Sequence, residues 1–135
     1  MATSYRLAIP ARNAAADAHC AALNGGTREL RTGAEPALLT DADSGTLIAT
    51  FTFGSPAFGA AVNGIATANA VTSVTAVASG TVAHFRDKTS GGVVRAQGNV
   101  TNVAGDGSYK IDNPAIVSGQ LCVFGTVTHE QKEQP

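Results

Sequence analysis

The side chains that could do chemistry in this chain of 135 residues are few and widely spaced. The natural metal ligands and nucleophiles are His19, Cys20, His84, Cys122 and His129. His19 and Cys20 are neighbours on a predicted helix, so their side chains point in different directions. No C-x2-C or H-x3-H spacing is present to preorganise a zinc site from these residues. We therefore expect no metal site.

His84 lies in the predicted strand Thr81–Arg86, where a histidine could serve as a base or a metal ligand. The alternative is a strand residue that faces the sheet interior or an interface, and we favour this interpretation. A small hydrolase or lectin-like module would instead need a compact polar pocket, for which His84, Arg86 and Asp87 are the candidates.

The remaining patterns associated with catalysis are incomplete. The run Asp41–Gly45 is similar to part of a calcium loop but lacks the distal glutamate. Ser55 is not framed by the G-x-S-x-G sequence of a nucleophile elbow. The glycine pairs Gly25-Gly26 and Gly91-Gly92 lack the lysine of a phosphate-binding loop. We expect no catalytic residue, no cofactor and no enzyme activity.

Composition narrows the choice of partners. The net charge is −1, only 14 % of residues are charged, and the nine Lys and Arg residues are scattered rather than clustered. This argues against a nucleic-acid partner, because such proteins carry a basic stripe. No run reaches the roughly 18 apolar residues needed to span a membrane, and the first ten residues do not look like a secretory signal. A surface poor in charge points to contact with another protein.

One helix is predicted over Ala11–Asn24, because the segment is rich in alanine, the best helix former. Pro10 stands just before it, and Gly25-Gly26 supplies a stop with left-handed freedom. The predicted buried face consists of small residues and one leucine, with Cys20 at its edge: Ala15, Ala18, Ala22 and Leu23.

After Gly26 the pattern changes to period two and is rich in threonine and valine, which is typical of strands. The predicted strands are Thr27–Thr32, Thr46–Phe53, Ile65–Val71, Thr81–Arg86, Val93–Val100, Tyr109–Ile111, Ala115–Val117 and Leu121–Thr128. In the clearest strand, one face carries Leu47, Ala49, Phe51 and Phe53 and should be buried. Asn63-Gly64 and Asp106-Gly107 are signals for tight hairpins.

Many short strands separated by frequent turns predict a mainly β fold, a sandwich or a barrel. We expect a single domain over residues 1–135, with an N-terminal arm over 1–10, the helix over 11–24 and a polar C-terminal tail over 129–135. Gly33–Ala42 should be a surface loop. We expect Cys20 and Cys122 to be buried, reduced thiols, although the sequence leaves a single bond between them open.

The order of several turns and strand starts carries a further signal. These segments are Ala22–Thr27, Arg31–Pro36, Gly45–Thr50, Phe53–Gly59, Gly64–Ala68, Gly80–Arg86 and Ile116–Gln120. In this order they resemble small virion proteins of tailed phages and prophages, and more narrowly the capsid cement (decoration) proteins of Bordetella podophages. The resemblance runs from about Tyr5 to Thr128 and rests on structural motifs rather than catalytic ones.

The resemblance implies a jelly-roll-like β-sandwich that dimerises on the outer capsid surface and clamps neighbouring major capsid proteins, after assembly in the host cytoplasm. It identifies no contact residues. From the chain itself, the terminal segments Tyr5–Pro10 and His129–Pro135 are candidate interface segments, because termini can be ordered by docking on a neighbour. Disordered ends are the alternative interpretation, and the sequence favours it at least as strongly. A tail or baseplate component, and less readily a lectin-like module, are the alternatives.

Overall fold

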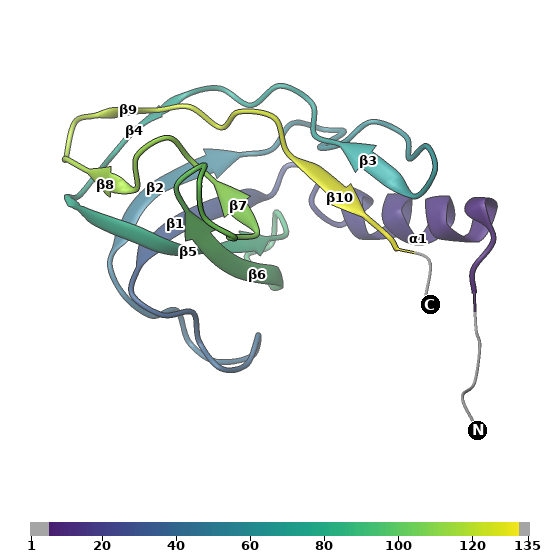
Figure 1. Cartoon of the computed structure of the whole chain (residues 1–135), viewed down its shortest axis with the longest axis horizontal. Coiled ribbons are helices and arrows are strands. Elements are labelled where there is room, and N and C mark those ends of the chain that lie inside the picture. The colour runs from purple at the N-terminus through teal and green to yellow at the C-terminus, as the bar shows by residue number, and fades with distance from the viewer. Residues whose placement is uncertain (1–5, 133–135) are drawn as a thin grey trace.

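Alternating apolar residues build a curled, mainly β structure with an N-terminal helix, as expected from the sequence (Figure 1). The structure is a computed structural model that describes residues 6–132. Its elements are α1 (Ile9–Ala21), β1 (Thr27–Thr32), β2 (Leu47–Thr52), β3 (Ile65–Thr67), β4 (Val74–Thr75), β5 (Gly80–Lys88), β6 (Val94–Thr101), β7 (Tyr109–Lys110), β8 (Ala115–Ile116), β9 (Leu121–Cys122) and β10 (Thr128–Glu130).

The main sheet has the strand order β2-β1-β5-β6-β7, and β8 pairs with the start of β5. Its pairs are antiparallel except for β6 and β7, which run parallel. Two further ribbons, β10 with β3 and β4 with β9, lie over one side of this sheet (Figure 1). The arrangement is compatible with a β-sandwich, and the jelly-roll connectivity stays a prediction.

The helix α1 lies beside the β3–β10 ribbon and is tied to the chain that precedes β3 (Figure 1). The carboxylate of Asp17 accepts a hydrogen bond from the backbone N–H of Ala61 at 2.8 Å. The side-chain oxygen of Asn13 accepts one from the N–H of Gly64 at 2.7 Å. These polar bonds hold an alanine-rich helix, which has little side-chain surface to bury, in place beside the β3–β10 ribbon.

The core lies between the main sheet and the ribbons and is centred on aromatic rings. The ring of Phe124 meets the rings of Phe51 and Phe53 edge to face, with centroids 5.2 and 5.7 Å apart. Edge-to-face packing adds favourable electrostatics to the area that each ring buries. The expected burial of Ala49, Phe51 and Phe53 is therefore confirmed. Leu47 is only half-buried, and Ile48 is fully buried instead, because the pairing of β1 with β2 shifts register at this end.

A charged pair is buried beside these rings. Arg28 donates two hydrogen bonds to the carboxylate of Asp87, at 2.6 and 2.7 Å, and its guanidinium carbon lies 4.0 Å from the centroid of the Phe85 ring. A bidentate contact and an aromatic face both offset the cost of removing a guanidinium from water. Arg28 and Asp87 are also direct partners across β1 and β5, so the pair contributes to strand alignment.

The helix prediction needs correction at both ends and on its face. The helix covers Ile9–Ala21 rather than Ala11–Asn24, because Pro10 fits the first turn, where its missing N–H is not needed. Asn24 lies beyond the helix, and its side chain accepts a hydrogen bond from the N–H of Ala57 at 2.8 Å. The residues of this segment that face the core are Ala16, Cys20 and Leu23, whereas Ala15 and Ala18 are exposed.

Of the two predicted tight hairpin turns, one is confirmed and the other is wrong. Asn63-Gly64 forms the expected tight turn, with both residues at positive φ and reciprocal hydrogen bonds between Val62 and Ile65. Asp106-Gly107 does not form a tight hairpin, because β7 runs parallel to β6. The N–H of Gly107 instead bonds to the hydroxyl of Thr101 at 3.0 Å, which folds the connection back on itself.

The segments at the two ends also differ from expectation. The predicted strand Leu121–Thr128 is broken into β9 and β10, and the predicted tail over 129–135 begins inside β10, where His129 pairs with Ala66. Of the predicted arm over 1–10, Ile9 and Pro10 belong to α1. Residues 1–5 and 133–135 lie outside the described part of the chain.

Truncation of Phe51 tests the core. We expect Phe51→Ala to lower the free energy of unfolding by about 3–5 kcal/mol, because it leaves a cavity among packed rings. Val77→Ala removes an exposed apolar side chain and should change it by less than about 0.5 kcal/mol. Urea denaturation of both variants measures the difference, and equal losses would place Phe51 outside the core.

Candidate functional site

The three residues proposed for a compact polar pocket do not share one. Side chains alternate along β5, so Asp87 points into the core toward Arg28, whereas Arg86 bonds to the β1–β2 loop on the opposite side of the sheet. His84 is fully buried, and its Nδ1 lies 2.8 Å from the carbonyl oxygen of Gly33. The interpretation of His84 as a buried strand residue is confirmed.

The possible zinc ligands are only partly brought together. The rings of His19 and His129 meet with centroids 4.4 Å apart. Cys20 and Cys122 are buried free thiols, and burial raises the pKa of Cys20 to about 11 and also raises that of Cys122. Within residues 6–132, no group of three or more His, Cys, Asp or Glu side chains is placed to hold a metal ion.

The run Asp41–Gly45 takes part in a charged cluster on the solvent side of β1 and β5. We define this charged cluster as Glu29, Arg31, Asp43, Arg86 and Lys88. The carboxylate of Asp43 accepts hydrogen bonds from Lys88 at 2.7 Å and from Arg86 at 2.9 Å. These bonds, that from Lys88 first, lower the pKa of Asp43 to about 2. The cluster is closed by Glu29, which bonds to both Arg31 and Lys88.

Arg86 connects this cluster to the β1–β2 loop, residues 33–45, which we call the braced loop. Its side chain is 1 % exposed, and its three nitrogens reach five acceptors, as many as a guanidinium has N–H groups. The acceptors are the carbonyl oxygens of Leu38, Leu39 and Asp41, the carboxylate of Asp43 and the side chain of Gln97. The loop backbone therefore closes around a buried charge.

Further bonds fix the loop at several points. The side chain of Gln97 donates to the carbonyl oxygen of Pro36 at 2.6 Å. The carboxylate of Asp41 accepts from the N–H of Leu38 at 3.0 Å, which makes a turn at the tip. Gly45 has φ +68°, and a Cβ there would lie 1.8 Å from the carbonyl oxygen of Thr32. Only glycine fits this close return of the loop to β1.

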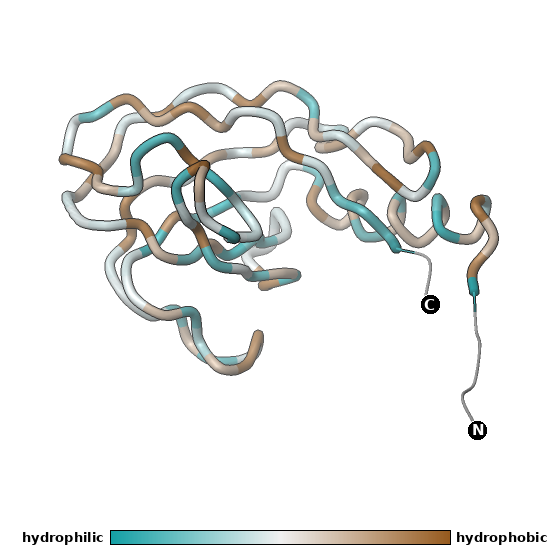
Figure 2. Tube along the Cα trace, in the orientation of Figure 1, coloured by the Kyte–Doolittle hydropathy of each residue, from teal (hydrophilic) through white to brown (hydrophobic). Residues whose placement is uncertain are grey.

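The tip of the braced loop is apolar and faces solvent. Leu38 is 62 % exposed and Leu39 is 44 % exposed, and Figure 2 shows hydrophobic colour at this tip. Beside it lies an open hollow of about 420 Å³, whose lining includes Leu39, Val93 and Val94. The bonds to Arg86, Gln97 and Asp41 hold the loop backbone under this tip in one conformation, so binding of the tip would cost little backbone entropy.

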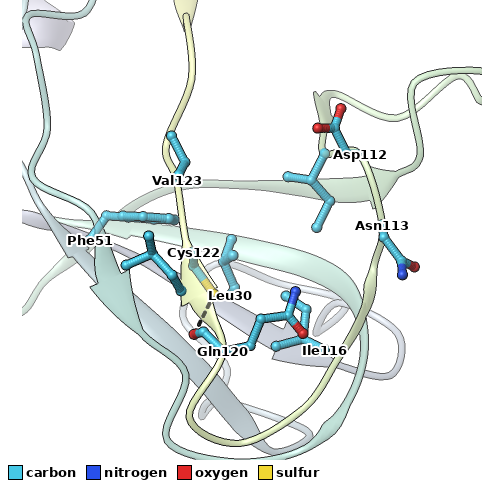
Figure 3. Close-up of a pocket in the computed structure, with 10 residues that line it drawn as sticks. Leu30, Phe51, Asp112, Asn113, Ile116, Gln120, Cys122 and Val123 are labelled. Atoms are coloured by element: carbon cyan, nitrogen blue, oxygen red, sulfur yellow. Dashed lines mark hydrogen bonds between the residues drawn. The ribbon is translucent and has the colours of Figure 1, made fainter.

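A smaller hollow lies elsewhere, among β8, β9 and the chain before them (Figure 3). Its volume is about 200 Å³, and we call it the socket. Seven of its ten lining residues are apolar and three are polar. It is lined by Leu30, Phe51, Ile111, Asp112, Asn113, Ile116, Gln120, Leu121, Cys122 and Val123.

The predicted surface loop over Gly33–Ala42 is confirmed, but sequence reasoning missed both the bonds that brace this loop and the socket. A signal for the first is present, since Glu29 and Arg31 alternate on one strand and Arg86 and Lys88 on another. Such charges face each other only in the observed alignment, which places Glu29 opposite Arg86. The sequence does not specify which strands are neighbours, so the cluster could not be assembled from it.

Comparisons with known proteins add no relative. No protein-family model matches the chain, and no curated protein or solved structure matches it significantly. No helix among residues 6–132 is long and apolar enough to cross a membrane.

Replacing Arg86 tests whether it holds the braced loop. In Arg86→Met, the carbonyl groups of Leu38, Leu39 and Asp41 lose their donor, so we expect faster amide exchange across residues 33–45 and a lower melting temperature. Arg95→Met, which removes an exposed arginine from β6, is the matched control and should leave both unchanged. Unaltered exchange in Arg86→Met would show that the loop does not depend on this side chain.

The histidine pair predicts a pH dependence. Burial, followed by the nearby charges of His129 and Arg95, lowers the pKa of His19 below 6.5, against the attraction of Asp87. Burial also lowers the pKa of His129, again against Asp87. The unfolded chain therefore binds protons first, so stability is full above about pH 6.5 and falls as the pH drops below it.

We expect the melting temperature to fall between pH 7.5 and 5.5, and His129→Gln to flatten that decline. Asp43 titrates near 2 and contributes no slope in this range. Thermal unfolding followed by circular dichroism measures both proteins. A melting temperature independent of pH, or an undiminished slope in the variant, would contradict the assignment.

Proposed function

We propose that this chain is a non-enzymatic virion structural protein, a cement or decoration protein of a phage capsid. It binds the outer surface of the assembled head as a homodimer and stabilises contacts between major capsid proteins. Assembly takes place in the host cytoplasm. The protein uses no cofactor and engages neither nucleic acid nor membrane.

The observation that carries this proposal is the braced loop. A buried arginine commits every N–H of its guanidinium to one loop and to a neighbouring strand, while the tip of that loop exposes two leucines. A free apolar tip gains nothing for an isolated chain, since water surrounds it. The same tip, held rigid, provides an apolar anchor for a protein partner.

The chemistry of the other candidate residues supports a structural role. The members of the charged cluster are bonded to one another and to loop carbonyls, so their donors and acceptors are already used. His84 is fully buried and lines neither of the two hollows described above. The order of turns and strand starts, which resembles that of cement proteins, names the class of partner.

Stabilisation follows from mass action. A protein that binds only the assembled lattice shifts the equilibrium toward that lattice. A two-fold dimer presents the same patch twice, so it bridges two capsid subunits and gains from effective concentration. Because apolar contact at the loop tip dominates, moderate salt should weaken the binding little.

A tail or baseplate component is the second candidate, because it would use the same rigid apolar loop. A lectin-like module is less favoured, since His84, Arg86 and Asp87 do not line a common pocket. Location on the particle distinguishes the first alternative, and sugar binding would distinguish the second.

The loop tip can be tested on phage heads that lack this protein. We expect the purified chain to bind such heads and to raise the temperature at which they release DNA. The double variant L38D/L39D should bind at least tenfold more weakly, because carboxylates replace the apolar anchor. Val103→Asp, which places the same charge on an exposed valine of the β6–β7 turn, is the control and should bind normally.

Co-sedimentation with heads and a DNA-release assay measure binding and protection. Equal binding by L38D/L39D and the unaltered chain would remove the loop tip from the interface. Identical release temperatures for bare and treated heads would overturn the cement function itself.

A further inference from the structure

The socket is a second apolar feature on a different side of the molecule from the braced loop. In Figure 1 the loop between β1 and β2 extends below the main sheet, whereas β8 and β9 lie at its upper left. Two separated contact features on one small domain suit a protein that joins neighbours. We therefore ask which chemical group of a partner fits the socket.

The floor of the socket reaches the core. Leu30 and Phe51 line it although each is 1 % exposed, and Ile116 and Cys122 line it at 6 %. Its volume of about 200 Å³ is below the 300–1,000 Å³ typical of sites for cofactors and drug-sized ligands. A dry cavity of about 150 Å³ is enough for benzene in another protein. The size therefore fits one large apolar side chain.

One hydrogen-bond donor is directed over this floor. The side-chain oxygen of Gln120 accepts a hydrogen bond from the N–H of Val117 at 3.1 Å, which orients the amide. Figure 3 shows the amide nitrogen of Gln120 turned toward the space between Phe51 and Asn113. No described residue accepts a hydrogen bond from this nitrogen. A hydrogen-bond donor beside an apolar floor is complementary to a partner residue whose side chain is apolar and whose main-chain carbonyl can accept a hydrogen bond.

The rim of the socket carries one charged residue and two exposed apolar residues. Asp112 is the one charged residue among those that line the socket, and no ion pair joins it to another residue within 6–132. Figure 3 places its carboxylate at the edge, pointing away from the floor. Leu121 and Val123 are 63 % and 64 % exposed and flank the opening. The rim complements a basic residue next to an apolar one.

We propose that the socket receives one large apolar side chain of a partner protein. The main-chain carbonyl of that partner residue accepts a hydrogen bond from Gln120, and a basic residue beside it in sequence meets Asp112. This inference rests on the proposed function for the source of the segment, which is then a capsid subunit. The braced loop and the socket give the protein two separate attachments.

A pair of dipeptides tests the socket without any capsid. The probes are acetyl-Phe-Lys-methylamide and acetyl-Phe-Glu-methylamide, titrated into the full chain and followed by NMR shifts of residues 111–123. We expect the lysine probe to bind with about millimolar affinity, the range for ligands of this size, and the glutamate probe to bind at least threefold more weakly. Asp112→Asn should remove that difference.

Gln120→Glu provides the variant for the donor. It keeps the acceptor for the N–H of Val117 but replaces the donating amide with a carboxylate. The probe for this variant is the uncharged acetyl-Phe-methylamide, because an added carboxylate would attract the lysine of the other probe. The uncharged probe should bind Gln120→Glu at least fivefold more weakly than it binds the unaltered chain. Asn102→Asp makes the same kind of change in the β6–β7 turn and should have no effect. Absence of lysine-probe shifts at residues 111–123, equal affinities of the lysine and glutamate probes, or undiminished binding of the uncharged probe by Gln120→Glu would overturn the socket.

The two cysteines report on the socket when the protein is on heads. Cys122 lines the socket, whereas Cys20 lies on the buried face of α1 and serves as an internal control. We expect binding to heads to slow alkylation of Cys122 by N-ethylmaleimide several-fold and to leave Cys20 unchanged. If the chain binds heads and Cys122 reacts as before, the capsid does not fill the socket. If it does not bind heads, the proposed function fails while the dipeptides still decide the socket.

Discussion

A guanidinium that is removed from water needs all of its hydrogen bonds, and Arg86 obtains them only when the loop over residues 33–45 closes around it. Removing one partner of a buried, hydrogen-bonded charge is costly, because the charge that remains is buried without a partner. The five acceptors come from the loop and from one glutamine on β6. Sheet, loop and exposed tip therefore form one cooperative unit, and the proposed contact with a partner depends on it.

A second buried arginine works on the other side of the same strands. Arg28 pairs with Asp87 inside the core, whereas Arg86 binds the loop outside it. A shift of β5 by one residue against β1 would turn Asp87 away from Arg28 and would turn Arg86 into the core. The two arginines thus favour one alignment of the central strands. In a domain with few large apolar residues, these two arginines help to specify the fold. The fixed strand alignment also holds the tip of the braced loop and the socket at fixed positions on different sides of the molecule.

Much of the fold could be predicted because local pattern and turn chemistry agree with it. The alternation around Phe51 and the turn at Asn63-Gly64 are local signals, and both lead to the observed structure. The predictions that failed depend on contacts between segments that are distant in the sequence. Asp106-Gly107 has hairpin chemistry, yet β7 joins β6 in parallel, and His129 belongs to a strand because β3 offers it an edge.

The candidate site could be predicted less well from the sequence than the fold. Arg86 and Asp43 are 43 residues apart in sequence, and their contact depends on which strands are neighbours. The socket likewise combines Leu30 and Phe51 with residues after 110, so no single segment carries its pattern. Sequence could indicate a charge-poor, β-rich chain of the kind that contacts proteins, but not the surface that makes the contact.

The central claim concerns where this protein lies and in how many copies. Quantitative mass spectrometry of purified particles, combined with a density map of the head, measures both. We predict copies in a fixed, symmetry-allowed ratio to the major capsid protein, with density on the outer shell that bridges neighbouring subunits. A few copies confined to the tail, or none on the particle, would contradict the account.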